Sequence, residues 1–596
     1  MNEKNIKALK PEASSILILP LVLVIAVSPL IIHLKIIPVD QAISDFWNSP
    51  RNNDFFSYYK SVLVVVGAVL AAAALLAGAC SKRLSIKKSY LYIPVSLYAI
   101  CIIFSTALSE YPRTALSGFP DRYEGAIVLL SYLVVFIAAM NLPDKASHIK
   151  LIAGSLLVSS AIIGTIGLLQ YFGYDIFKSA PGKWLMLYPL HTGAENMVYG
   201  DKTGTIFATL YNPNSLGMYM SMLFPISLSG FLLVKGNAYK IIAGLSTCLM
   251  FANLIGSNSR GSYIGAFFAA VLIVVLMRKR AAKGWRSLAG IVLCLALIYF
   301  GMNYISGGSV FSRTGSILTG RDIHAEDGII DKIKDFKING SQLTLYCTNS
   351  LLKIGAADNR ILFSDENGQA LTLGSTGKDG EYTLKNGKYS GYTVTISGNL
   401  IKVQKGKSFL YFAITNTGFK FLNSKGRVLE NADIEKLGFE GMERLGSGRG
   451  YIWSRTLPLL KHTLLYGHGP DTFAMYFPQN DYIGKLNFMY DANIIIDKPH
   501  NMYLQIAVNT GVVSLIAFLL IMGFYYFNSV KILLKSKFGD FSSIAGLSLF
   551  AAITGYVLSG FFTDSTVSVS PVFWVLLGLG IGLNYLKKQP AAKGEL

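Results

Sequence analysis

The residues best suited to chemistry lie in one stretch, 448–503, toward the C-terminal end of the chain. Arg449 stands between two glycines ahead of a run with helical spacing, Arg455 follows one to two turns later, and His500 closes the stretch. Guanidinium groups and the amides of a helix start both bind phosphate oxygens well. A neutral imidazole can take a proton from a hydroxyl near neutral pH. The stretch therefore predicts a phosphate site beside a general base.

A further arginine with the same potential, Arg260, lies far upstream. It stands in the sequence Ser-Asn-Ser-Arg-Gly-Ser, 257–262, between two apolar runs. A charge at the centre of a membrane helix costs about 2.5–3.5 kcal/mol on insertion scales, so an arginine near that depth calls for an anionic partner. Its small polar neighbours let a ligand approach closely. We expect Arg260 to bind an anion; the alternative is that it extends to lipid headgroups.

Other polar residues stand where apolar runs begin. Asn212 and Asn214 open one run, where they can cap a helix or bind a sugar or phosphate. Arg122 opens another and is a second candidate phosphate contact. His468, between two glycines, is expected to be a turn residue. Near the candidate base and Arg449, the substrate-binding candidates are Asn501, Tyr503 and Trp453.

The composition indicates that a membrane surrounds these residues. Of the 596 residues, 52% are hydrophobic and only 15% are charged, with a mean hydropathy of +0.44, whereas soluble domains have about 25% charged residues. The net charge of +20 could indicate nucleic-acid binding. However, the cations form short clusters between apolar runs, which is what membrane topology produces. We therefore expect a bilayer, and no nucleic acid, as partner.

About twelve apolar runs are long enough to cross a ~30 Å hydrocarbon core, which takes about 20 residues. They lie at 15–35, 59–79, 90–109, 125–142, 149–172, 212–234, 239–257, 260–277, 287–305, 501–528, 541–562 and 570–586. Lysines and arginines cluster in alternate loops, at 4–10, 82–88, 145–150, 235–240, 278–286, 531–537 and 587–594. Because such loops stay inside the cell, we expect a plasma-membrane protein with both termini in the cytoplasm.

The long polar segment 306–500 is then extracytoplasmic. Its middle, 329–430, contains β-rich runs separated by Gly, Asn and Asp turns, which is typical of antiparallel strands. The fold class is therefore an all-α polytopic membrane protein with an inserted extracytoplasmic antiparallel β domain. We expect helices in 1–305, the β domain followed by a helical catalytic-loop region at 441–500, and the last helices and tail in 501–596. The β domain is expected to be an accessory or acceptor-docking module.

Several motifs are absent from the sequence. The five cysteines form neither a disulfide framework nor a metal-ligand spacing. The sequence has no Gly-x-x-x-x-Gly-Lys-Ser/Thr loop, no His-Glu-x-x-His and no Asp-x-Asp. We therefore expect no metal, no cofactor and no ATP-driven transport.

Together, these features resemble the O-antigen ligase and polymerase family, which includes O-antigen ligases, O-unit polymerases and protein O-oligosaccharyltransferases. The resemblance rests on about twelve spans, a long external loop near the C-terminal end, Ser-Arg-Gly at 259–261, Gly-Arg-x-x-Ile-Trp at 448–453, Gly-x-Gly…Phe at 467–473 and His-Asn at 500–501. Residue-level matches cluster in 204–262 and 448–512. The inserted β module is larger than the family's loop.

The resemblance implies a metal-independent glycosyltransferase that uses an undecaprenyl-type polyprenyl-pyrophosphate glycan donor. It implies that Arg260 binds the pyrophosphate, that Arg449 neutralises the leaving group, and that His500 activates a hydroxyl of a polysaccharide, lipid or protein acceptor. Fixed guanidiniums stabilise the charge that builds on the leaving group, and in-line attack inverts the anomeric carbon. These three side chains are then expected to converge where the membrane meets the exterior.

Two other functions fit parts of the sequence. A transporter or flippase of lipid-linked glycans should show internal repeats and interrupted helices, and no clear repeat is seen. A peptidoglycan-type polymerase would use an external carboxylate as base, for which Asp491 or Asp497 is available.

Overall fold

The computed structural model divides the chain into two compact units. The helical unit comprises Met1–Gly315, His462–Met475 and His500–Leu596, and the β-containing unit comprises Ser316–Lys461 and Tyr476–Pro499. The structure describes residues 15–39, 43, 50–82, 84–188, 206–278, 280, 284–319, 333–357, 360–385, 387–406, 408–423, 426–430, 434–489 and 491–588.

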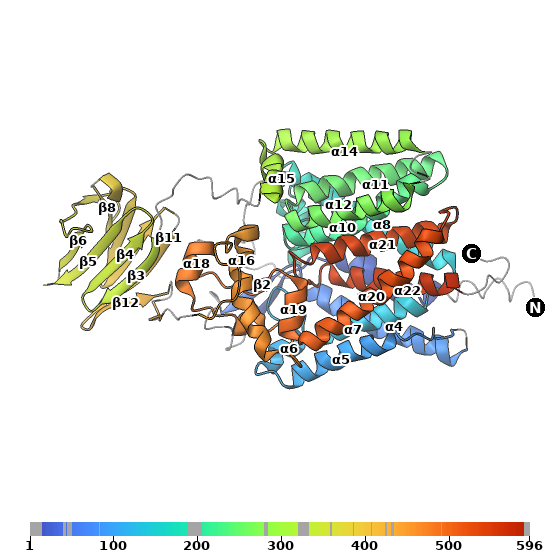
Figure 1. Ribbon diagram of the computed structural model, residues 1–596, viewed down its shortest axis with the longest axis horizontal. Helices are drawn as coiled ribbons and strands as arrows, with labels where there is room; N and C mark the ends of the chain where they lie inside the picture. Colours follow the sequence, from blue (N-terminus) through green and yellow to red (C-terminus); the bar gives the residue numbers. More distant parts are fainter. Residues whose placement is uncertain are drawn as a thin grey trace, which may run out of the picture. The chain divides into compact units, whose positions relative to one another are not determined.

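The helical unit is built from long apolar helices (Figure 1). Among the described residues, seven helices are long and apolar enough to cross a membrane: α4 (Tyr58–Cys80), α8 (Ala146–Tyr171), α10 (Pro213–Leu233), α11 (Asn237–Gly256), α14 (Trp285–Ile305), α20 (Val512–Lys535) and α21 (Phe541–Ser559). Shorter apolar helices are Leu19–Leu30, α5 (Tyr92–Ala107), α7 (Ala126–Asn141) and α12 (Arg260–Leu276). With α22 (Ser570–Lys588), a helix coincides with every predicted run, which confirms a multi-pass membrane protein.

The count of about twelve spans and their orientation stay predictions. The terminal segments on which the predicted orientation partly rests, 1–14 and 589–596, lie outside the described residues.

Small residues allow the central helices to pack closely. A Cβ on Gly265 of α12 would lie 2.3 Å from the carbonyl oxygen of Gly555 in α21, and a Cβ on Gly555 would lie 2.1 Å from that of Ser221 in α10. Glycine and serine at such contacts let membrane helices approach each other. As a result α10 is the most enclosed of the seven long helices, whereas α14 is mostly exposed.

Two predicted spans are shorter or less regular than the sequence suggests. The first, 15–35, is helical only to Leu30, and its continuation forms β1 (Lys35–Pro38), paired with β2 (Arg51–Asp54). The run 501–528 is divided into α19 (Met502–Asn509) and α20, because Gly511 adopts a left-handed conformation with φ +107°.

The segment that contains Gly467, His468 and Gly469 stabilises the break at Gly511. The amides of His468 and Gly469 donate to the carbonyls of Val508 and Asn509, at 3.0 and 2.9 Å. These are carbonyls at the end of α19 that would otherwise lack an intrahelical partner. A Cβ on Gly467 would lie 2.2 Å from the carbonyl carbon of Asn509, so only glycine fits there.

The β-containing unit holds two antiparallel sheets (Figure 1). The first has the order β3 (Ile333–Asn339), β4 (Gln342–Cys347), β5 (Leu351–Ala357) and β6 (Arg360–Ser364). The second has the order β12 (Gly418–Leu422), β11 (Ser408–Thr415), β10 (Leu400–Lys405), β9 (Tyr392–Ser397), β8 (Glu381–Leu384) and β7 (Leu373–Ser375). Alternate residues of both sheets, such as Leu345 and Val403, share one buried core, which makes a sandwich and confirms the predicted antiparallel β structure.

The remaining helices in the described segments are short. They are α6 (Pro112–Ser117), α9 (Ala180–Leu187), α15 (Ser309–Thr319), α16 (Leu445–Thr456), α17 (Phe473–Tyr476) and α18 (Tyr482–Met489), and a 3-10 turn, Leu457–His462, follows α16. The run with helical spacing that follows Arg449 in the sequence corresponds to α16 and this turn.

Candidate functional site

His500 is held by a buried carboxylate. Its Nδ1 lies 3.1 Å from Oδ2 of Asp564, and the imidazole is 29% exposed while the Asp564 side chain is 3% exposed. A carboxylate at Nδ1 favours the tautomer that carries its proton there, which leaves Nε2 as an acceptor. The arrangement therefore gives a half-exposed base with a fixed orientation.

The start of α19 holds this pair together. Asn501 caps the helix, because its Oδ1 accepts from the amides of Tyr503 and Leu504 at 2.9 and 3.1 Å. The amide of Asn501 donates to Oδ1 of Asp564 at 3.2 Å. The Tyr503 hydroxyl donates to the carbonyl of Val557 at 2.7 Å. Asn501 and Tyr503, predicted to bind substrate, thus contact the protein itself and position the residues around His500.

Arg260 begins α12 and is half-buried. A Cβ on the next residue, Gly261, would lie 2.6 Å from Cβ of Phe562, so the start of α12 packs on the loop 561–569. The same loop carries Asp564. Arg260 and His500, 240 positions apart in the sequence, are therefore both anchored to one short loop of the helical unit.

The start of α10 lies against the turn that precedes Arg260. A Cβ on Gly217 would lie 2.6 Å from Cβ of Ser259. Asn212 caps α10, with its Oδ1 accepting from the amide of Ser215 at 2.9 Å, and Asn214 is half-buried in the first turn. The capping interpretation of Asn212 is thus observed, and sugar or phosphate binding by either asparagine stays a prediction.

Arg122 is buried against a carboxylate that the sequence analysis did not assign. Its guanidinium pairs with Asp471, and both side chains are almost completely buried. Oδ2 of Asp471 also accepts from the amides of Phe119 and Glu124, at 2.6 and 3.2 Å. The pair therefore joins the loop before α7 to the segment before α17, and the charge of Arg122 is balanced within the chain.

Arg449 belongs to the β-containing unit. The first turn of α16 is irregular, because Gly446, Ser447 and Gly448 have positive φ angles of 61°, 65° and 89°, so the regular helix begins at Arg449. The half-buried Arg449 donates through Nη1 to the carbonyl of Gly446 at 2.5 Å. The predicted helix start at Arg449 is therefore present.

Arg455 and Trp453 point to neighbours within the same unit. Arg455 donates through Nε to Oδ2 of Asp481 at 3.0 Å, and its guanidinium lies 4.3 Å from the ring centre of Tyr451. Trp453 donates through Nε1 to the carbonyl of Pro499 at 2.8 Å. Arg455 is buried, and Trp453 fixes the backbone one residue before His500.

His468 is a neutral residue in a turn. Burial, with a smaller effect of His462, lowers its pKa to about 4, and Gly469 beside it has a φ of +117°. The hydroxyl of Ser109 donates to the His468 carbonyl at 2.7 Å. These contacts agree with the turn role predicted for His468.

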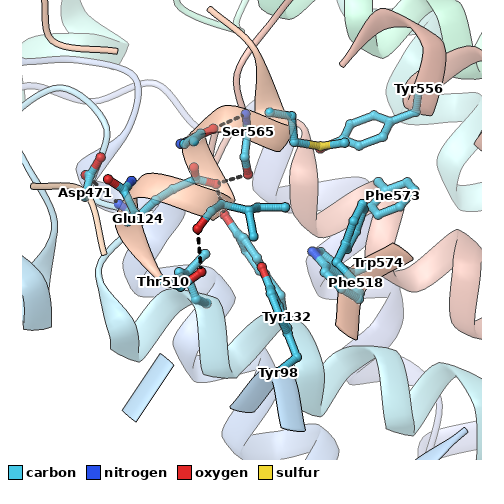
Figure 2. Close-up of a pocket in the computed structure, with 15 residues that line it drawn as sticks. Tyr98, Glu124, Tyr132, Asp471, Thr510, Phe518, Tyr556, Ser565, Phe573 and Trp574 are labelled. Carbon is cyan, nitrogen blue, oxygen red and sulfur yellow. Dashed lines mark hydrogen bonds between the residues drawn. The ribbon is translucent and has the colours of Figure 1, made fainter. Parts of the chain in front are cut away.

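A small cavity in the helical unit contains a carboxyl group that sequence reasoning missed (Figure 2). The cavity is about 40 Å³. Glu124 and Asp471 lie on one side of it and the rings of Phe518, Phe573 and Trp574 on the other (Figure 2). In the motif Asp-Arg-Tyr-Glu-Gly at 121–125 the arginine is the residue that stands out, whereas the glutamate is the one that lines a cavity.

Asp564 was missed because its loop, in the sequence, is distinguished only by its lack of cations.

Within the described ranges, no three His, Cys, Asp or Glu side chains are grouped as a metal site requires.

Residues 406–519 match a protein-family model described as O-antigen ligase. No curated protein and no solved structure matches the chain. The matched segment begins in the sandwich and includes Arg449, Arg455 and His500. The match supports membrane glycan transfer of the ligase or polymerase type, which uses lipid-linked glycans. It supports the family predicted from the motifs: the chain is a multi-pass membrane protein in which residues 406–519 match the O-antigen ligase model.

Proposed function

We propose that this protein transfers a glycan from a polyprenyl-pyrophosphate donor to a hydroxyl of an acceptor, at the outer face of the cytoplasmic membrane. The observation that carries the proposal is the His500–Asp564 pair, a half-exposed imidazole oriented by a buried carboxylate. His500 lies inside the segment that matches the O-antigen ligase model. An acceptor hydroxyl needs such a base to become a good nucleophile.

The reaction follows from this geometry. Asp564 holds the Nδ1 proton of His500, so Nε2 accepts the proton of the acceptor hydroxyl. The acceptor oxygen forms a bond to the anomeric carbon while the bond from that carbon to the pyrophosphate oxygen breaks, and its electron pair leaves with the pyrophosphate. Asp564 stabilises the imidazolium, which then loses its proton to water. Attack opposite the leaving group inverts the anomeric carbon. Because the donor is already activated, the transfer requires no metal or nucleotide.

Arg260 and Arg449 are the proposed pyrophosphate ligands. Each stands at the first regular residue of a helix, where backbone amides add to the attraction of the guanidinium for an anion. Arg122 and Arg455 are buried against Asp471 and Asp481. We therefore assign these two arginines to holding the surrounding segments, with a weaker part in pyrophosphate binding.

The remaining predicted residues are proposed to surround the donor sugar and the acceptor. Asn212 and Asn214 open the helix that packs on the turn before Arg260, so they are suited to polar groups of the donor. The sandwich is proposed to bind the acceptor, whether a polysaccharide, a lipid or a protein. The solvent-exposed residues of its strands would supply the charges and hydrogen bonds that bind the acceptor.

The test uses the full-length protein in lipid nanodiscs with an undecaprenyl-pyrophosphate glycan and candidate acceptors. His500→Ala is expected to lower kcat by about 10²–10⁴-fold, the usual contribution of a positioned base. Asp564→Asn is expected to approach that loss, because an amide at this position permits the wrong tautomer. His462→Ala, a change of an exposed histidine, is the matched control. Full transfer by His500→Ala would remove the base from the proposal.

One observation favours a transporter as second candidate. Gly511 interrupts the apolar run between α19 and α20, and interrupted helices are typical of transporters. Vesicles with fluorescent lipid-linked glycan separate the two functions, since flipping without transfer to any acceptor would replace the transferase. A polymerase with a carboxylate base would instead lose its activity in Asp491→Asn or Asp497→Asn and keep it in His500→Ala.

A further inference from the structure

Glu124 is a buried carboxyl group with an unusual set of contacts. Its side chain is 2% exposed and comes from the loop just before α7. Oε1 accepts hydrogen bonds from the hydroxyls of Tyr132 and Ser565, at 2.6 and 2.9 Å. Oε2 is buried and has no hydrogen-bond partner among the described residues. An acceptor left without a donor in this way is costly, which indicates either a proton on the carboxyl or a bound water.

The cavity beside Glu124 can hold that water. Asn509 lines the same space, and its buried Oδ1 also has no partner within the described part of the chain. A water molecule needs about 10–15 Å³ of such space and two to four polar partners. The cavity of about 40 Å³ therefore has room for two or three waters, and one that donates to both oxygens would satisfy them.

A single loop residue links Glu124 to the proposed base. Ser565, which donates to Glu124, also donates its amide to Oε1 of Gln505 at 2.7 Å. The residue before Ser565 is Asp564, which holds His500. Ser565 and its chain neighbour Asp564 therefore connect the Glu124 carboxyl to the carboxylate that lies beside the imidazole.

Burial brings the pKa of Glu124 close to neutral pH. Burial raises the pKa of Glu124 to about 7; the hydrogen bonds from Tyr132 and Ser565 and the charge of Arg122 oppose this shift, and the charge of Asp564 adds to it. The other titratable groups that face the cavity are Asp471, already paired with Arg122, and the hydroxyls of Tyr98 and Tyr556.

We propose that Glu124 and the water beside it form a proton-binding site that positions and tunes the His500–Asp564 pair. When Glu124 is protonated, Asp564 is the negative charge nearest the imidazole. When Glu124 releases its proton to the cavity water, a second negative charge appears near Asp564 and changes the electrostatic field at the His500–Asp564 pair. Glu124 is a positioning residue, since it acts through Ser565 and Asp564. Its effect on transfer rests on the proposed function, whereas the proton site itself does not.

The first test does not depend on activity. Infrared difference spectra of the full-length protein in nanodiscs, wild type minus Glu124→Gln, isolate the carboxylic-acid band of Glu124 during a pH titration. We expect the band to disappear near neutral pH, and Asp564→Asn to move this titration to lower pH because a like charge is removed. Asp540→Asn, a change of the carboxylate that caps the opposite end of α21, should leave it in place. Ionisation of Glu124 at the ordinary pH of a carboxyl group would overturn the proposal.

The second test measures transfer against pH. Glu124→Gln keeps an acceptor for Tyr132 and Ser565 but cannot become negatively charged. Because this charge is lost, the acidic limb of the kcat profile should move to lower pH by a fraction of a unit, with the donor KM unchanged. Glu124→Ala removes the contact with Ser565 and should also lower kcat several-fold. A Glu124→Gln profile that overlies the wild type would overturn the link to His500. A further outcome is that neither the wild type nor any variant transfers glycan, while Glu124 still titrates near neutral pH. In that case the proposed function fails and the proton site stands.

Discussion

Two regions of the molecule bury side chains in opposite ways. The sandwich, β3–β12, has an apolar core built from alternate strand residues such as Leu345 and Phe412. The polar loop cluster of the helical unit, which comprises 118–124, 467–472, 500–505 and 560–566, buries Arg122, Glu124, Asp471 and Asp564. Burying charge is costly unless every group is paired. The described strands of the sandwich bury one charged residue, Lys405, so the concentration of four in the loop cluster supports the proposal that the chemistry takes place there.

The largest expected difference between the regions comes from the buried ion pair. Asp471→Asn keeps the shape of the side chain but leaves the guanidinium of Arg122 buried without its carboxylate partner. Removal of one partner of such a pair typically costs about 3–5 kcal/mol. We expect a large drop in the apparent Tm of the helical unit, measured by thermal unfolding in nanodiscs.

The double variant Arg122→Met/Asp471→Leu is the matched control for this change. It removes both charges and keeps an apolar volume, so it should recover much of the lost stability. If the single and double variants unfold at the same temperature, the loop cluster does not depend on this pair.

A substitution of similar size in the sandwich should do much less. Ile401→Val removes one methylene from a fully buried position of β10, and such changes cost about 0.5–1.5 kcal/mol. Limited proteolysis should show faster cleavage in the β-containing unit only. Transfer with a soluble acceptor analogue then reports whether the sandwich contributes to acceptor binding. Equal losses from Ile401→Val and Asp471→Asn would show that the two cores respond alike.

The contrast also explains which features the sequence could predict. Strand alternation and Gly or Asn turns identify the sandwich, since each strand carries its own signal. Arg449 was recognisable because it stands at a helix start, and His500 was recognisable because a predicted span begins beside it. Asp564 and Glu124 carry no local signal: each is a single carboxylate in a short loop, 440 positions apart. Only the packing of α7, α19 and α21 brings Glu124, Gln505 and Ser565 together.

The break at Gly511 was missed for a similar reason. The run 501–528 is predominantly apolar, and Asn509, Thr510 and Gly511 within it are each compatible with a helix. The amides of 468 and 469, which bind the end of α19, come from a distant segment of the sequence. Long-range hydrogen bonds of this kind override local hydropathy.

The smallest expected effect is a pair of opposite pH dependences within the loop cluster. His468 has its pKa lowered from 6.5 to about 4, so the unfolded chain binds more protons between these values and stability falls as the pH is lowered through that range. Glu124 has its pKa raised from 4.5 to about 7, so the folded chain binds more protons there and stability falls as the pH rises toward 7.

Apparent Tm values measured at pH 4.5–7.5 test the predicted direction of both pH dependences of stability. Relative to wild type, His468→Gln should lose less stability toward acid, and Glu124→Gln should lose less toward neutral pH, each by about 2–4 °C. If the two variants changed the Tm profile with the same sign, Glu124 would not carry a proton in the folded protein. The polar loop cluster would then bury a permanent charge at that position, which requires a cation or further donors in the cavity.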